Sequence, residues 1–337
     1  MSSFFPPIDQ DVKASASSVG AEAYSYSVFT ETESYEKGFA KHYEENIKPF
    51  AAEFENSRVS ANTSVRNRLT ICVPLGLLLS GLSLWFFKFN DAMTIIMVIF
   101  IAGSAWSYSP LYRYKTAIKE RIFPKILLFF DGFKYFPKCD GISEKIKSSN
   151  IIPKYDDAFC EDKVTGRYKD VAIDLFETRL FKKQGRDSKM IFQGVIITLG
   201  SNKKFSGKTI IKKDHGSIGN WVDAKSAGLE NVKLEDPKFE NMFEVYSSDQ
   251  IEARYLLTAS FMERLLTLSE SFRSGTIECS FYDDILLMKI PVTENLFEPG
   301  DTDFKQDFVD DCKILLRQMH MIFGIIDTLK LDQNIGM

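Results

Sequence analysis

Histidines and common catalytic motifs are scarce in this sequence of 337 residues. The three histidines, His42, His215 and His320, lie far apart, and none stands at ligand spacing from a cysteine, so we predict no metal site. The motifs of phosphate-binding loops, dinucleotide folds, esterases and zinc proteases are absent as well. We therefore expect no cofactor, and an enzyme becomes the less favoured class of protein without being excluded.

The sequence also lacks a cysteine pair with the Cys-x-x-Cys spacing. Its five cysteines are Cys72, Cys139, Cys160, Cys279 and Cys312. An odd number of dispersed cysteines favours reduced thiols in a cytosol over a framework of disulfides. We expect them to be small, buried apolar side chains.

The chain has no overall excess of positive charge. Its 42 Lys and Arg stand against 46 Asp and Glu, so a nucleic-acid partner is not expected. The charge is nevertheless segregated, because residues 58–134 carry 10 Lys and Arg but 3 Asp and Glu, whereas residues 1–57 carry 4 and 10. The basic segment also contains the two most apolar runs, which relates its charge to membrane topology.

Two apolar runs predict a transmembrane hairpin. Leu69–Phe87 has 19 residues without a charge, and Ala92–Tyr108 has 17. Each is close to the roughly 20 residues that a helix needs to cross a hydrocarbon core of about 30 Å. The connector Lys88–Asp91 is short, so both ends of the hairpin are expected on one side. A secretory signal peptide is the competing interpretation, and the 68 acidic-rich residues before the first run argue against it.

Charged and aromatic residues at the ends of the runs indicate an orientation. Lys and Arg collect before the first run and after the second, so the positive-inside rule places both termini in the cytoplasm. Aromatic residues mark the two interfaces between lipid and water. The predicted interface anchors are Trp85, Trp106, Tyr108, Arg66, Arg68, Arg113 and Lys115.

The segments beside the spans are predicted to form a disordered tail, residues 1–30, and a helical stalk within residues 31–136. The tail is rich in Ser and Ala and has no apolar period. Apolar residues recur every three or four positions from Phe39 to Phe54 and again from Leu111 to Phe129. We favour a stalk in which these two faces cover each other. The alternative is that a basic helix over residues 111–136 lies flat on anionic lipid.

Residues 137–337 are predicted to form a cytoplasmic α+β domain with a mainly antiparallel sheet and packed helices. The runs Arg167–Lys182 and Lys189–Leu199 alternate or stay apolar, as strands do, and polar turns containing Gly separate them. A helix is predicted over Ile251–Phe272, with a break or bend at Thr258–Ser260, and another over Asp303–Leu331. Gly275–Phe281 and Asp284–Ile290 predict a hairpin across Tyr282–Asp283. Helices and strands occur in blocks rather than in strict alternation, which favours an α+β fold.

The densest cluster of polar residues lies within Leu234–Tyr255. In an enzyme, Asp249 or Glu252 would act as a general acid or base whose pKa is tuned by Arg254. In a structural role, Asp249 would cap a helix and Arg254 would pair with a carboxylate. We favour the structural interpretation, because nothing nearby resembles a nucleophile or a cofactor cradle.

Several groups of residues form a recognisable set. They are Gly166–Tyr168 with Asp170 and Glu177, Phe192–Gly194 with Val195–Ile197, Leu234–Asp236 with Phe239 and Phe243, Val245–Thr258, and Phe261–Leu265. Together they resemble DUF3137, a family of bacterial membrane proteins of unknown function, and the resemblance extends from about Tyr35 onward. Asp170 departs from the family pattern, because Gly is expected at this position, and the departure affects the expected geometry of a turn. The resemblance implies two spans and a cytoplasmic C-terminal domain, and it implies no reaction and no functional residues.

These observations predict an integral protein of the bacterial inner membrane with two passes and both termini in the cytoplasm. Its spans contact membrane lipid, and its cytoplasmic domain is expected to bind a protein or a lipid headgroup as an anchor, adaptor or regulator. One alternative is a membrane-bound enzyme that uses the carboxylates near Asp249–Arg254. Another is an accessory protein of transport or envelope maintenance. Homo-oligomerisation is left open.

Overall fold

The computed structural model describes residues 28–185, 187–201, 204–213, 228–271, 277–292, 297–300, 302 and 307–329. The chain divides into two compact units. The helical unit contains Ser25–Phe129 and Glu298–Ile314, and the sheet unit contains Phe130–Phe297 and Leu315–Met337. The predicted division at residue 137 assigns all later residues to the second domain. Residues 298–314 instead belong to the helical unit.

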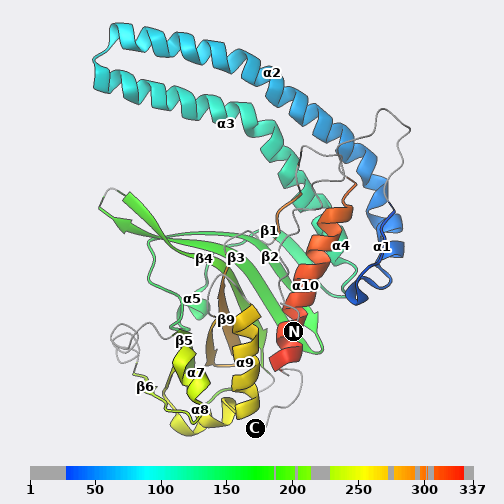
Figure 1. Cartoon of the computed structure of the whole chain (residues 1–337), viewed down its shortest axis with the longest axis vertical. Coiled ribbons are helices and arrows are strands. Elements are labelled where there is room, and N and C mark those ends of the chain that lie inside the picture. The colour runs from blue at the N-terminus through cyan, green and yellow to red at the C-terminus, as the bar shows by residue number, and fades with distance from the viewer. Residues whose placement is uncertain are drawn as a thin grey trace. The chain divides into compact units, whose positions relative to one another are not determined.

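The helical unit begins with a short 3-10 helix and continues through four α-helices (Figure 1). They are the 3-10 helix Ser34–Glu36, α1 (Phe39–Asn46), α2 (Lys48–Phe86), α3 (Phe89–Arg121) and α4 (Phe123–Leu127). Most of the predicted tail, residues 1–27, lies outside the described residues. Its described end is ordered at Phe29, which is buried against the rings of Phe39 and Tyr43.

The N-terminal part of α2 and the C-terminal part of α3 pack against each other. The Phe54 and Tyr114 rings lie 6.2 Å apart, and Arg121 donates to the Glu53 carboxylate at 2.6 Å. This pairing is the one that the stalk interpretation predicts. The predicted helix over residues 111–136 is too long, however, because α4 ends at Leu127. Gly132 then adopts φ +77, which suits a residue without a side chain, and the chain turns into a strand.

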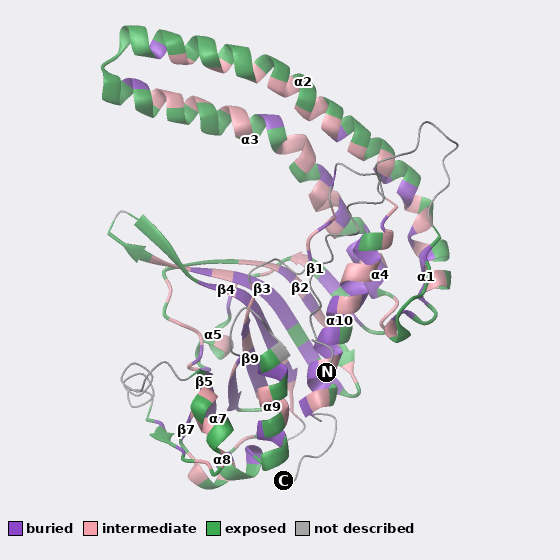
Figure 2. Cartoon of the chain, in the orientation of Figure 1, coloured by how far each residue is buried: buried purple, intermediate pink, exposed green. Residues whose placement is uncertain are grey.

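The upper parts of α2 and α3 form a hairpin whose apolar surface is exposed (Figure 2). Both helices are long and apolar enough to cross a membrane. In the most apolar stretch, only 6% of the residues are buried in α2 and 11% in α3. A core helix of a soluble protein would bury most of such a stretch. Small residues line the contact between the helices, since Gly103 faces Cys72 and Gly76 faces Ile99.

The sheet unit is built on nine strands among the described residues, and each strand pairs antiparallel with its neighbours (Figure 1). The strands are β1 (Lys134–Lys138), β2 (Asp157–Tyr168), β3 (Val171–Gln184), β4 (Asp187–Gly200), β5 (Thr209–Lys213), β6 (Glu230–Asn231), β7 (Phe243–Ser247), β8 (Glu278–Tyr282) and β9 (Ile285–Pro291). Their order is β1-β2-β3-β4-β9-β8-β5-β7-β6. The predicted mixture of helices with an antiparallel sheet is confirmed.

One predicted strand is wrong in its bounds. Arg167–Lys182 contains the end of β2, a turn and most of β3. The turn residues Lys169 and Asp170 have φ of +47° and +66°, as a two-residue hairpin requires. The resemblance leads one to expect Gly at position 170, and Gly adopts this conformation at lower cost than Asp.

The helices of the sheet unit are shorter than predicted. They are α5 (Glu144–Lys147), α7 (Pro237–Met242), α8 (Gln250–Leu256), α9 (Ala259–Ser271) and α10 (Val309–Leu329), of which the last continues from the helical unit. The predicted helix Ile251–Phe272 is divided between α8 and α9 by Leu257 and Thr258, at the edge of the break predicted at Thr258–Ser260. In Asp303–Leu331, residues 303–306, 330 and 331 lie outside the described residues.

Neighbouring residues of β8 show how the sheet buries both faces. Phe281 packs against the Phe261 ring of α9 at 5.7 Å. Tyr282 points to the opposite face, where it joins an apolar cluster with Ile142 and Ile151 from the loop around α5. Since side chains alternate along a strand, this part of the sheet is covered on two sides.

Candidate functional site

The predicted constellation Asp249, Glu252 and Arg254 lies at the start of α8. Asp249 is the N-cap, and its carboxylate accepts hydrogen bonds from the amides of Ile251 at 2.9 Å and Glu252 at 3.0 Å. These are two of the amides that the first turn of a helix leaves without partners. The cap that the structural interpretation predicts is present.

Glu252 and Arg254 also make structural contacts. The Glu252 carboxylate accepts from the amides of Ser206 and Gly207, both at 2.7 Å, and so fastens α8 to the loop before β5. Arg254 is exposed and donates to the Gln250 carbonyl oxygen at 3.0 Å, within its own helix, rather than to a carboxylate as we expected. The three residues are neighbours, but their hydrogen bonds have no shared target.

Replacement of the capping residue tests this assignment. We expect Asp249→Ala to lower the free energy of unfolding by about 1 kcal/mol, because two amides of α8 lose their acceptor. Asp249→Asn is the matched control, since Asn caps nearly as well. Thermal unfolding of the detergent-solubilised protein, followed by circular dichroism, would measure both. Equal losses in the two variants would contradict a capping role.

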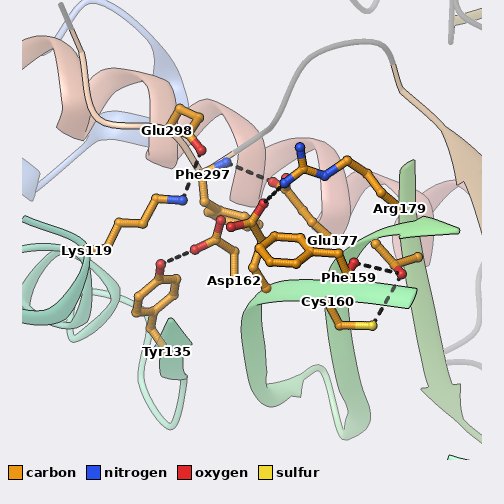
Figure 3. A network of polar contacts seen from close by, with 11 residues as sticks. Lys119, Tyr135, Phe159, Cys160, Asp162, Glu177, Arg179, Phe297 and Glu298 are labelled. Atoms are coloured by element: carbon orange, nitrogen blue, oxygen red, sulfur yellow. Dashed lines mark hydrogen bonds and ion pairs between the residues drawn. The ribbon is translucent and has the colours of Figure 1, made fainter. Parts of the chain in front are cut away.

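A second polar cluster, which the sequence did not reveal, lies in β2 and β3 (Figure 3). Oxygen atoms of Glu161, Asp162 and Glu177 all lie within 4.8 Å of one another. A β-bulge in β2 brings them together, because the register with β3 shifts between Glu161 and Val164. Asp162 sits in the bulge at φ +53, which Asp tolerates better than most residues, and it is fully buried.

Each carboxylate of this cluster has a protein donor. The Tyr135 hydroxyl donates to Asp162, Arg179 donates to Glu161 at 3.0 Å, and the Phe297 amide donates to the buried Glu177 at 2.9 Å. Burial, followed by the nearby Asp162 carboxylate, raises the pKa of Tyr135 well above its usual range. Tyr135 therefore stays protonated as a donor.

A small pocket opens beside the cluster. Glu161, Glu177 and Arg179 line it, and the Arg179 guanidinium lies 4.7 Å from the centre of the Phe159 ring. Carboxylate oxygens suit a hard cation such as Mg²⁺ or Ca²⁺. Tyr135, Arg179 and Phe297 already donate hydrogen bonds to these carboxylates, so a bound cation is not needed to stabilise them. We therefore assign the cluster to the packing of β1, β2 and β3.

Sequence spacing explains why this cluster escaped notice. The three carboxylates and their donors come from β1, β2, β3 and the segment at Phe297. Their hydrogen bonds join residues up to 120 positions apart. The available signal was Glu177, a charged residue inside an apolar strand, which we singled out only for the family resemblance. A buried carboxylate in such a position requires donors.

The predicted interface anchors all lie on α2 and α3. Trp85, at the connector end, is 84% exposed, while Trp106 and Tyr108, at the other end, are about half exposed. Arg68 bridges the helices there, since its guanidinium donates to the Trp106 carbonyl oxygen and the Ser109 hydroxyl, both at 2.7 Å. It also lies over the Trp106 ring at 4.9 Å. Arg66 and Arg113 are exposed, and Lys115 is half-buried.

Comparison with protein families addresses the resemblance. Residues 190–331 match DUF3137, described as a protein of unknown function. The predicted resemblance to DUF3137 is thereby confirmed over this segment, which includes the string Val245–Thr258. The groups at Gly166–Tyr168 and Glu177 lie before it. The DUF3137 segment begins in β4 and contains α8. The capped helix that we considered as an active site therefore lies within the residues that match the family.

Other comparisons add little to the DUF3137 match. No curated protein matches the chain. Among solved structures, the mycobacterial trehalose monomycolate transport factor A, TtfA, is similar with a TM-score of 0.32 and 12% identity, over 58% of this chain and 88% of that chain. A similarity at this TM-score carries no argument about fold or function.

Proposed function

We propose that this chain is a two-pass protein of the bacterial inner membrane whose sheet unit is a cytoplasmic binding or regulatory domain. The exposed apolar surface of the α2–α3 hairpin carries the first part of the proposal. Residues 69–86 of the first predicted span lie in α2, and these 18 residues are about 27 Å long at 1.5 Å per residue, close to the thickness of a hydrocarbon core. Lipid is the environment that covers such a surface at least cost.

The two ends of the hairpin support an orientation. Trp85 marks one end, while Arg68 and Trp106 mark the other, together with the exposed Arg66 and Arg113. Arginines on the side of the chain termini favour a cytoplasmic location for both termini. Arg68 satisfies its guanidinium at the interface instead of carrying it into the apolar region, as long basic side chains do near the ends of spans.

Reporter fusions test the membrane topology. We expect green fluorescent protein fused after Met337 to fluoresce and alkaline phosphatase fused there to be inactive, because fluorescence needs the cytoplasm and phosphatase activity the periplasm. The matched control places each reporter after Asn90, in the first turn of α3 and within the predicted connector, where the results should reverse. Extraction of the chain by alkaline carbonate, or an active phosphatase after Met337, would contradict the proposal.

A binding role is favoured over the enzyme alternative by the contacts at α8. Asp249 and Glu252 direct their carboxylates to backbone amides, and the structure offers no specific observation for a reaction there. The same helix exposes Ile251 and Tyr255, which are 71% and 62% accessible and one turn apart. We expect that replacing both exposed residues by Asp abolishes binding of the protein partner to the sheet unit. Affinity purification of the full-length protein would measure this loss.

The outer strands of the sheet do not favour a partner that adds a strand. β1 carries Pro137, which cannot donate to a neighbouring strand, and β6 has only two residues. Natural sheets use both devices to block their edges. Side-chain surfaces such as that of α8 are therefore better supported as the place of contact.

A further inference from the structure

Two cysteines face each other where β1 joins the sheet. Phe136 pairs with Lys163 and Lys138 with Glu161 in the antiparallel ladder of β1 and β2. The same register, continued by one residue, places Cys139 opposite Cys160. Residues directly opposite each other in antiparallel strands have Cα atoms about 4.5 to 5.5 Å apart, within the range that a disulfide spans.

The side chains of the two cysteines also lie close together. Both pack against the same apolar cluster, and the nearby Cys139 adds to the effect of burial in raising the pKa of the Cys160 thiol. Both are half-buried, so a small oxidant has access to them. The other cysteines lie elsewhere: Cys72 contacts Gly103 in the helical hairpin, and Cys279 and Cys312 are buried.

We propose that Cys139 and Cys160 form a reversible disulfide when the protein meets an oxidant, and that this pair is a redox-sensitive site of the sheet unit. With hydrogen peroxide, the two thiols give up two electrons and two protons, one S–S bond forms, the O–O bond breaks, and two molecules of water leave. With a low-molecular-weight disulfide, exchange releases its two thiols instead. An excess of dithiol reverses either reaction.

The surroundings of Cys160 set the conditions for the reaction. Its sulfur also contacts the Thr178 hydroxyl at 3.3 Å, and Thr178 in turn donates to the Phe159 carbonyl oxygen (Figure 3). Burial raises the pKa of the Cys160 thiol, an effect that its hydrogen bond with Thr178 opposes. The thiolate is the reactive form, so the disulfide should form slowly near neutral pH and faster as the pH rises. In a reducing cytosol the pair stays as thiols until oxidant accumulates.

The disulfide has a structural consequence for β1. This strand is the outermost of the sheet and is held on one side by β2. A covalent bond at its end would hold it in place beside Tyr135, whose hydroxyl donates to Asp162. The site would thus convert an oxidising signal into a more firmly attached sheet edge.

Peptide mapping of the full-length, detergent-solubilised protein tests the proposal. The protein is treated with hydrogen peroxide or oxidised glutathione, its remaining thiols are alkylated, and it is digested with trypsin without reduction. We expect Cys139–Lys145 to be recovered joined to Tyr155–Lys163, with a mass two hydrogens below their sum, and to separate after reduction. Cys139→Ser and Cys160→Ser should each abolish this species, and Cys279→Ser should leave it unchanged.

The outcomes separate this pair from random oxidation. Recovery of both peptides as separate alkylated or over-oxidised species would overturn the proposal, and so would their joining in equal amounts to Cys72 or Cys312. Hydrogen exchange supplies a second readout, since the oxidised protein should exchange the amides of Lys134–Lys138 about tenfold more slowly than the reduced one. Unchanged exchange in a fully linked sample would overturn the proposed effect on β1. The wild-type protein suffices for both measurements.

Discussion

Replacement of Gly194 by Val is expected to prevent stable folding of the sheet unit. Gly194 lies in β4 opposite Pro291 of β9. A Cβ atom at this position would lie 2.2 Å from the Ile290 carbonyl oxygen and 2.9 Å from both the Pro291 Cα and the Phe192 ring. The carbonyl belongs to the ladder and has little freedom to move, so we expect a loss of about 3 kcal/mol or more in the free energy of unfolding.

Thermal unfolding and the yield of membrane-extracted protein would measure this effect. Gly200→Ala is a suitable control from the same strand, because its nearest neighbour is the Ala172 side chain at 3.2 Å rather than a backbone oxygen. We expect a small change in that variant. A Gly194→Val protein that unfolds at the wild-type temperature would show that β4 and β9 do not approach each other so closely.

Replacement of Asp311 by Asn is expected to stabilise the protein at pH 8. Asp311 is buried at the start of α10, where its carboxyl accepts from the Gly300 amide at 2.6 Å. Burial raises the pKa of Asp311 from 3.8 to about 6, which the nearby Asp310 and Asp307 reinforce. The folded protein thus favours the neutral carboxyl, and ionisation above pH 6 costs roughly 3 kcal/mol if the shift is taken in full.

The pH dependence gives the sign of the effect. The stability contributed by the neutral carboxyl is complete below about pH 3.8 and is lost as the pH rises through 6. Asn is neutral throughout, so the advantage of Asp311→Asn should be absent at pH 4 and should reach about 2 to 3 kcal/mol at pH 8. Denaturant unfolding at several pH values would measure it. Asp310→Asn, at the exposed neighbour, is the control, and an equal gain there would contradict the assignment.

Local features of the fold could be predicted where the cause is local. The two apolar runs and the cap at Asp249 depend on residues adjacent in sequence, and both have the predicted helical structure. The hairpin of β8 and β9 likewise follows from two alternating runs around a short turn.

Features that depend on distant residues were not predicted. The short β1 contains Pro137 and gains its strand geometry from pairing with β2, and the bulge at Asp162 is visible only in the register with β3. The carboxylate cluster needs donors from Tyr135 and Phe297, which no spacing rule connects. Sequence patterns report which residues share a face, but they do not report which faces meet.

The return of residues 298–314 to the helical unit affects the order in which the protein can be completed. In that unit the Phe308 ring packs on Phe54 at 5.3 Å, the Tyr43 hydroxyl donates to the Asp307 carbonyl oxygen at 2.7 Å, and Lys119 pairs with Glu298 at 3.0 Å. About 190 residues separate the second apolar run from this segment, and a ribosome needs roughly 10 to 40 s to add them. During that interval Phe54 and Tyr43 lack their covering segment, so a chain that stalls before Glu298 presents an incomplete helical unit to chaperones and proteases.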